Sequence, residues 1–224
     1  MKTFTELHAY AAIENDVIAN LSTYIHCKAE DVLTIVIVGA FDGNDITRMM
    51  PLYPHAHFIA IEPYSENFFM LKKKYGNHPR VKCLNVACSD FEGEANFYEL
   101  SAGGNGSLLK VSDKSIYKLK EIGQVKVQVR TLDSILENVS VDLLWMDVQG
   151  NELNVLKGYK NQDKALSMYL EVAVEGCGHE SYEGNCHLSD LEKHLTGHTL
   201  HSIGLDNELK NGTGNSFWLR KDLI

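Results

Sequence analysis

Two acidic residues stand at the ends of apolar segments, where a carboxylate could take part in proton transfer. Asp147 follows LLWM (143–146), and Glu171 lies within YLEVAV (169–174). A group that reacts as a nucleophile often has to lose a proton first, which requires a base or a metal ion. A dry pocket at a strand end raises the basicity of a carboxylate. We therefore predict Asp147 as the first candidate base and Glu171 as the second. The alternatives are a helix N-cap for Asp147 and a solvated strand end for Glu171.

A second group of residues could bind a nucleoside. In IVIVGAFDGND (35–45), Gly39 and Gly43 allow the backbone to turn sharply and to approach a ligand closely. The spacing is not GxGxxG, which disfavours NAD. Glu62 comes 23 residues after Gly39, close to the roughly 20 residues at which an acid reaches ribose hydroxyls in nucleotide-binding folds. The alternative is a tight turn without a ligand and an exposed acid at a strand end.

The segment NVACSD (85–90) adds a candidate adenine contact. Asp90 could accept a hydrogen bond from the adenine amino group, and Ala87 leaves room for a flat ring, although Ser-Asp is also common in turns. The predicted cofactor-binding residues are Gly39, Ala40, Phe41, Asp42, Gly43, Glu62, Pro63, Ala87, Ser89, Asp90, Asp147 and Gln149.

The segment EGCGHESYEGNCH (175–187) is rich in residues that bind metals. These are Glu175, Cys177, His179, Cys186 and His187. Their spacing matches no common zinc pattern, so no metal ligand is predicted. We expect this loop to overhang the site and to shape an acceptor pocket, with His179 or His187 as a further candidate base.

A divalent metal ion at Asp147 remains an alternative that we do not favour. No second acid is adjacent to Asp147, and the nearest, Glu152, is expected on the helix that follows.

Strands separated by helices must position these residues. Buried strands are predicted at 32–38, 57–62, 81–87, 141–147 and 168–174, and helices at 5–25, 42–51, 65–75, 151–159 and 188–196. This alternation predicts a mainly parallel sheet that binds ligands beyond the carboxyl ends of its strands. TLHSIG (199–204) and SFWLRK (216–221) predict an antiparallel hairpin.

Between the predicted strands at 94–100 and 125–130 lie a glycine-rich loop and a polar insert, and we expect residues 101–123 to act as a mobile lid.

Composition bounds the remaining possibilities. The chain of 224 residues predicts one domain, with a helical lead over 1–30 and an α/β core over 31–224. No apolar run reaches the ~18 residues of a membrane span, and the N-terminus has no signal-peptide pattern. Five cysteines without a CxxC motif indicate reduced thiols and a cytoplasmic protein. The net charge of −9 disfavours a nucleic-acid partner. A homodimer is left open.

A series of motifs resembles the FkbM family of S-adenosylmethionine-dependent methyltransferases. The motifs are IVIVGAFDGN, FIAIEP, VACSDFEGEANFYE, VRTLDSIL, VDLLWMDVQGNELNVLKG and LEV, in order over about residues 34–172. The resemblance implies a class I methyltransferase fold, with a seven-stranded sheet, an antiparallel C-terminal hairpin and helices on both faces. It also implies O-methylation of a hydroxyl on a small molecule such as a sugar, a polyketide or a lipid or glycan.

Carried over by residue, the resemblance implies roles for the candidates. Gly39 and Gly43 turn around S-adenosylmethionine, Glu62 holds its ribose, Asp90 lies near adenine, and Asp147 sits beside the transferred methyl group.

The chain departs from the family at three positions: Ile37, where many members have an acid, Trp145, where others have Lys, and Gln149, where others have Glu. These departures keep one rival open, a catalytically weak or inactive methyltransferase-like binding module. A nicotinamide-dependent epimerase or reductase fits the sheet and Glu62 but not the glycine spacing.

Overall fold

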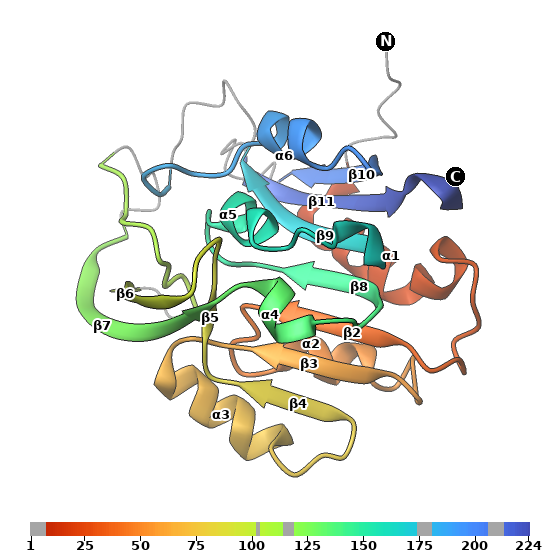
Figure 1. The fold of residues 1–224 in the computed structure, drawn as a ribbon, viewed down its shortest axis with the longest axis horizontal. Helices are drawn as coiled ribbons and strands as arrows, with labels where there is room; N and C mark the ends of the chain where they lie inside the picture. The colour runs from red at the N-terminus through yellow and green to blue at the C-terminus, as the bar shows by residue number, and fades with distance from the viewer. Residues whose placement is uncertain (1–7, 102–103, 114–118, 174–180, 206–212) are drawn as a thin grey trace.

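The computed structural model describes residues 8–101, 104–113, 119–173, 181–205 and 213–224 (Figure 1). In chain order the strands and helices are β1 (His8–Ala9), α1 (Tyr10–Tyr24), β2 (Thr34–Val38), α2 (Asn44–Met49), β3 (His57–Ile61), α3 (Ser65–Tyr75), β4 (Val81–Leu84), β5 (Ala87–Cys88), β6 (Gly93–Leu100), β7 (Glu121–Arg130), α4 (Leu132–Leu136), β8 (Val141–Met146), α5 (Glu152–Lys157), β9 (Ala165–Ala173), α6 (Leu188–His194), β10 (His198–Leu205) and β11 (Thr213–Arg220). No helix in this part of the chain is long and apolar enough to cross a membrane.

The main sheet has the order β1-β10-β11-β9-β8-β2-β3-β4. Strands β4, β3, β2, β8 and β9 run parallel to one another. Strand β11 pairs antiparallel with both β9 and β10. The predicted mainly parallel sheet with an antiparallel C-terminal hairpin is confirmed. The two-residue β1, which pairs with β10, adds an edge strand that the sequence did not predict. The chain builds outward from β2 through β3 to β4, then returns to the other side of β2 with β8. That reversal is the position at which such sheets bind ligands.

Helices cover both faces of this sheet because alternate strand residues point to opposite sides (Figure 1). Ile35, Ile37 and Trp145 pack in one apolar cluster with residues of α1, α2 and α3. Val36, Val38 and Met146 pack in a second cluster with residues of α4, α5 and α6. The β-branched and leucine-rich runs that predicted strands buried on both faces therefore account for both layers of the core.

A small second sheet of order β5-β7-β6 lies beside the main sheet (Figure 1). The single strand predicted over 81–87 is wrong in its second half, because β4 ends at Leu84 and the chain re-enters a strand only at Ala87. Asn85 marks the break, since its side-chain amide donates to the carbonyls of Glu62 and Pro63. This bend moves Ala87 out of the main sheet and into pairing with β7.

Candidate active site

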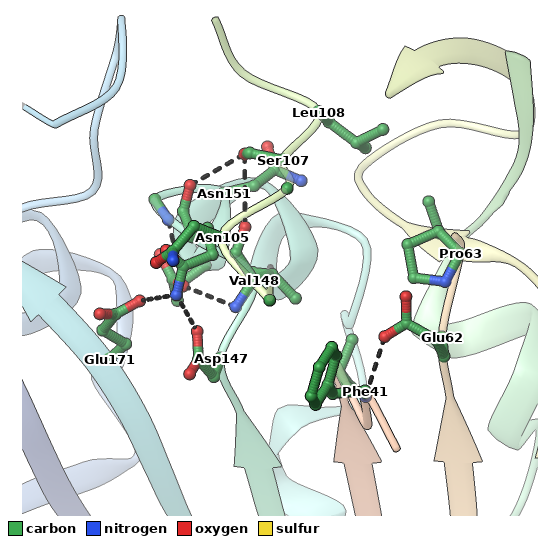
Figure 2. Close-up of a pocket in the computed structure, with 18 of the residues that line it drawn as sticks. Phe41, Glu62, Pro63, Asn105, Ser107, Leu108, Asp147, Val148, Asn151 and Glu171 are labelled. Atoms are coloured by element: carbon green, nitrogen blue, oxygen red, sulfur yellow. Dashed lines mark hydrogen bonds between the residues drawn. The ribbon is translucent and has the colours of Figure 1, made fainter. Parts of the chain in front are cut away.

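A cavity of about 740 Å³ lies beyond the carboxyl ends of β2, β3, β8 and β9, at the point where strand order reverses (Figure 2). Its volume falls within the range of about 300–1,000 Å³ that is typical of ligand sites. The predicted residues that line it are Gly39, Ala40, Phe41, Asp42, Glu62, Pro63, Ala87, Asp147, Gln149 and Glu171. Three predicted residues do not line it: Gly43, Ser89 and Asp90.

The turn after β2 depends on glycine at two positions for different reasons. Gly39 has φ +84°, and a Cβ there would lie 1.8 Å from the backbone oxygen of Asp147. This close approach brings the end of β2 against the end of β8. Gly43 has φ +80°, and a Cβ there would meet the side chains of Tyr75 and Leu71. Gly43 therefore serves the packing of α2 against α3 and does not face the cavity.

Glu62 is buried at the end of β3, with only 4 % of its surface exposed. One carboxylate oxygen accepts the backbone N–H of Phe41 at 2.9 Å (Figure 2). The other accepts the backbone N–H of Tyr64 at 3.0 Å. Burial raises the pKa of Glu62, and these two hydrogen bonds oppose the rise. The oxygen that accepts from Tyr64 also accepts from the side-chain amide of Asn67 at 3.4 Å, whereas the oxygen that accepts from Phe41 keeps a further acceptor position, which a hydroxyl group of a ligand could use.

The cavity is lined here by both residues of β5, Ala87 and Cys88, and by Val86, which precedes the strand. Asp90 is exposed to solvent and accepts a hydrogen bond from the hydroxyl of Ser89. The Ser89 carbonyl packs so closely against Gly158 that a Cβ on that glycine would lie 2.1 Å away. Ser89 and Asp90 thus form a turn against the end of α5, and the cavity wall at this point is apolar.

Three carboxylates gather at the ends of β8 and β9. Oxygens of Asp147, Glu152 and Glu171 lie within 4.8 Å of one another. Glu152 was expected on the helix that follows Asp147, and this position does not remove it from the site. Glu152 does begin α5, but its carboxylate turns back and accepts the backbone N–H groups of Val148 and Gly150. The N–H groups of this turn therefore draw a third acid into the site.

Burial and mutual repulsion alter the charge of this cluster. Burial raises the pKa of Glu152 to about 8, and the charge of Asp147 adds to the rise. Burial likewise raises the pKa of Glu171 well above its usual value, with further contributions from Asp147 and Glu152. Carboxyl groups this close together cannot all ionise at neutral pH. The cluster therefore retains protons that could be exchanged with a bound ligand.

Gln149 connects two of the three acids. Its side-chain nitrogen donates to Asp147 at 2.5 Å and to Glu171 at 3.0 Å, and its side-chain oxygen accepts from the hydroxyl of Tyr182 at 2.6 Å. Figure 2 labels the two accepting carboxylates, Asp147 and Glu171, each of which has a dashed line that marks a hydrogen bond. A cation that bridged Asp147 and Glu171 would have to displace the amide.

Two segments that the sequence did not connect, residues 104–112 and 181–186, form the part of the cavity wall that we call the roof. Ser112 donates its backbone N–H to Ser181, and Glu183 donates its own to Lys110, so residues 110–112 and 181–183 pair antiparallel. The roof residues that line the cavity include Asn105, Ser107, Leu108, Ser181, Tyr182 and Asn185. No local pattern signalled this pairing.

The expected overhang of loop 175–187 is tested only in part. Tyr182, Asn185 and Cys186 line the cavity. His187 lies just before α6, where its backbone N–H donates to Asp190, and it is not among the lining residues. Glu175, Cys177 and His179 lie outside the described residues, as do positions 102–103 and 114–118 of the expected lid.

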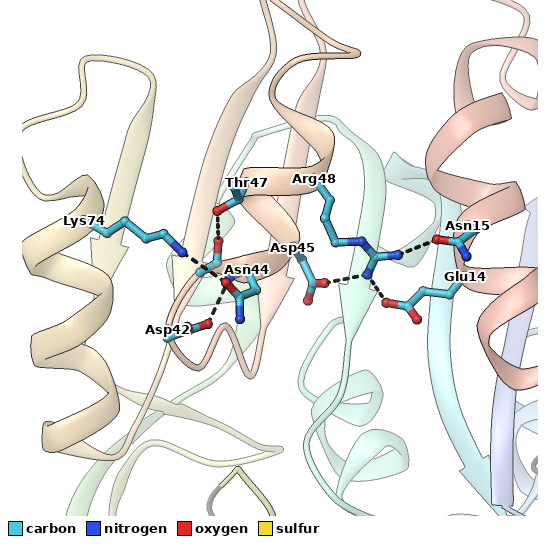
Figure 3. Close-up of polar contacts among 9 residues, drawn as sticks. Glu14, Asn15, Asp42, Asn44, Asp45, Thr47, Arg48 and Lys74 are labelled. Carbon is cyan, nitrogen blue, oxygen red and sulfur yellow. Dashed lines mark hydrogen bonds and ion pairs between the residues drawn. The ribbon is translucent and has the colours of Figure 1, made fainter.

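Polar contacts join α1 to α2 (Figure 3). Arg48 on α2 pairs with Glu14 on α1 and with Asp45, and it also donates to Asn15. Glu14 and Asp45 line the cavity, which sequence reasoning missed because α1 is distant in the chain. Burial and the charge of Glu14 raise the pKa of Asp45 to about 6.

The charged residues that line the cavity are all acids within the described part of the chain. They are Glu14, Asp42, Asp45, Glu62, Asp147, Glu152 and Glu171, and no Lys, Arg or His lines it there. Such a lining favours a cationic or neutral ligand over a phosphorylated one.

Comparisons with known proteins agree with this geometry. The family model for the methyltransferase FkbM domain matches residues 38–196. A 2-O-methyltransferase, NoeI, from Sinorhizobium fredii (strain NBRC 101917 / NGR234) is 30 % identical over 162 residues, which cover 67 % of this chain and 65 % of the relative. The match thus spans slightly less than two thirds of that relative's length.

Solved structures with a similar fold are more distant in sequence. Fibrillarin from Aeropyrum pernix, solved with bound S-adenosyl-L-methionine, has a TM-score of 0.53 at 10 % identity, covering 92 % of this chain and 74 % of its own. The N-terminal domain of human METTL16, solved with SAH, has a TM-score of 0.51 at 10 % identity, covering 94 % of this chain and 70 % of its own. The shared fold is that of the class I methyltransferases.

Proposed function

The chain belongs to the FkbM methyltransferase domain family, and from this premise we propose that it is an S-adenosylmethionine-dependent O-methyltransferase. Its acceptor is a hydroxyl group on a small molecule such as a sugar, a polyketide or a lipid or glycan. The observation that carries the proposal is one cavity that joins two features: the glycine turn beside Glu62 at one side and the Asp147–Glu171 pair at the other. The first suits a nucleoside, and the second suits an alcohol that must lose a proton.

The lining of the cavity fits this cofactor. S-adenosylmethionine carries a positively charged sulfonium and an ammonium group, and the charged residues of the described lining are acids. Glu62 would accept hydrogen bonds from the ribose hydroxyls, and Ala87 would lie against the adenine ring. Ile37, at a position where many family members have an acid, is buried among apolar side chains. Glu14 and Asp45 are the acids that would hold the ammonium group in its place.

When bound, the cofactor supplies an electrophilic methyl group. Asp147 accepts the proton of the acceptor hydroxyl, and Glu171 and Glu152 keep the surrounding charge low by holding protons of their own. Because the amide of Gln149 lies between Asp147 and Glu171, we propose proton removal by Asp147 without a bridging metal ion. Base catalysis of this kind contributes about 10²–10⁴ to a rate.

Titration calorimetry with S-adenosylhomocysteine and with NAD tests the proposal. Binding of the first and not the second is expected, and the reverse result would point to a nicotinamide enzyme. Transfer of a labelled methyl group to a panel of neutral sugars, polyketides and glycans then tests activity. Tight binding of S-adenosylhomocysteine without transfer to any hydroxyl acceptor would favour the inactive binding module, for which the departures at Ile37 and Gln149 are the supporting features.

A further inference from the structure

We propose that Gln149 is a positioning residue, whose side-chain amide, oriented by the hydroxyl of Tyr182, holds Asp147 and Glu171 as one proton-sharing pair. This inference rests on the proposed function and deepens it, because it names what aligns the base. Of the four residues, Asp147 and Gln149 follow β8, Glu171 lies near the end of β9, and Tyr182 belongs to the roof segment at 181–183, so the pair is assembled by contacts across the cavity.

The backbone of Gln149 shows that its placement is enforced. Gln149 has φ +57°, in the left-handed region that residues other than glycine rarely adopt. Such a conformation persists when the surrounding contacts hold it in place. Here the hydroxyl of Ser107 donates to the backbone oxygen of Gln149 at 2.9 Å, while the side-chain amide is held by three partners. Both the main chain and the side chain of this residue are therefore fixed.

A neutral amide suits the electrostatics of this position. It offers one N–H to each carboxylate and adds no charge of its own. The groups that face the pair from neighbouring elements are acidic or neutral. Among the described residues they are Glu152 from α5, Glu62 after β3 and Asp45 from α2, and the charge of Asp147 raises the pKa of each. A glutamate at position 149 would add another negative charge, whereas glutamine links Asp147 to Glu171 by hydrogen bonds alone.

Tyr182 determines which end of the amide faces the acids. Its hydroxyl lies 2.6 Å from the side-chain oxygen of Gln149 and 2.8 Å from the backbone oxygen of Asn105. The hydroxyl can donate to the amide oxygen, which leaves the nitrogen facing Asp147 and Glu171. With the amide reversed, its oxygen would face two carboxylates. The buried ring of Tyr182 thus couples the roof of the cavity to the alignment of the pair.

Nuclear magnetic resonance of two variants tests the inference. Tyr182→Phe removes only the hydroxyl, and Gln149→Leu removes the amide. Because leucine tolerates a positive φ poorly, Gln149→Leu could fail to fold, and Tyr182→Phe then decides the result alone. Tyr64→Phe is the control, since the Tyr64 hydroxyl bonds Glu99 and Tyr64 does not line the cavity.

Two signals are followed: solvent exchange of the Gln149 side-chain amide protons and the carbon-13 titration of the Asp147 and Glu171 carboxyl groups. In the wild type we expect slow exchange and two separated titration steps that belong to the pair. Tyr182→Phe should speed the exchange at least tenfold. Gln149→Leu should raise the lower apparent pKa of the pair by about one to two units. This change corresponds to the free energy of a hydrogen bond to a charged group. Tyr64→Phe should change neither signal.

Rapid amide exchange in the wild type, or exchange and titration left unchanged by Tyr182→Phe, would overturn the inference. Binding of S-adenosylhomocysteine to the same samples separates this result from the proposed function. Failure of the wild type to bind would refute the cofactor proposal while the resonance data still report on the pair. In active preparations, Tyr182→Phe should lower kcat and leave the KM for S-adenosylmethionine unchanged, because Tyr182 acts through Gln149 on the base.

Discussion

Two acids of the cavity, the buried Glu62 and the half-buried Asp147, are held in opposite ways. Glu62 is satisfied by the backbone N–H groups of Phe41 and Tyr64, which belong to the turns at the ends of β2 and β3. Asp147 instead receives the side-chain amide of Gln149, whose own orientation depends on Tyr182 in the roof. Backbone groups of a packed turn are held in place by the chain itself, whereas the orientation of a side chain depends on the partners that it bonds. The first arrangement suits constant binding of a ligand, and the second suits a residue that must gain and lose a proton.

The largest effect is expected at the second acid. Asp147→Asn keeps the shape of the side chain but removes the proton acceptor, so turnover should fall by about 10²–10⁴ while cofactor affinity stays within a few-fold. Steady-state kinetics and calorimetry measure the two quantities. Asp133→Asn is the control, because Asp133 bonds the backbone at Lys160 and does not line the cavity. An Asp147→Asn enzyme of full activity would leave that carboxylate a structural role only.

The first acid should affect binding more than rate. Glu62→Ala should weaken S-adenosylhomocysteine by about 1.5–3 kcal/mol, the cost of losing hydrogen bonds to a charged group. Calorimetry of the variant against Glu66→Ala, an exposed acid on α3, measures the difference. Equal affinity in wild type and Glu62→Ala would remove Glu62 from the binding site and would end the contrast between the two acids.

The acid cluster should make stability depend on pH. The pKa of Glu152 is raised to about 8 in the folded protein, whereas an unfolded glutamate has a pKa of about 4.3. The folded state therefore binds an extra proton between these values, and the stability it contributes at low pH is lost as pH rises through 8. Relative to Glu152→Gln, the Tm of the wild type should fall as the pH rises from about 4 to about 8. Parallel Tm curves for the two proteins would contradict the raised pKa.

The smallest effect is expected in the roof. Ser107 is buried, donates to the backbone oxygen of Gln149 and accepts from the N–H of Leu109. Ser107→Ala should lower stability by about 1–3 kcal/mol, because a buried backbone N–H loses its partner. Urea unfolding measures the change, with the exposed Ser101→Ala as control. A variant as stable as the wild type would show that the roof contributes nothing to holding Gln149.

Much of this site could be predicted because the relevant signals are local. The β-branched run before Gly39, the acid that ends the next strand, and Asp147 after LLWM all follow from short patterns. Parallel strands then place their carboxyl ends at one edge of a sheet, so Gly39, Glu62 and Asp147 meet in one cavity. Asp90 shows the limit of this reasoning, because a strand that bends at Asn85 no longer delivers its end to the same edge.

By itself, the sequence determined the alternation of strands and helices, the C-terminal hairpin and the turn at Gly39, since each depends on residues a few positions apart. Only the tertiary structure decided that Glu152 turns back toward Asp147, that Gln149 bridges Asp147 and Glu171, and that Tyr182 orients Gln149. The last two contacts join residues 22 and 33 positions apart. Hydrogen bonds across such separations depend on how two loops pack in space, and no periodicity or spacing in the sequence indicates that packing.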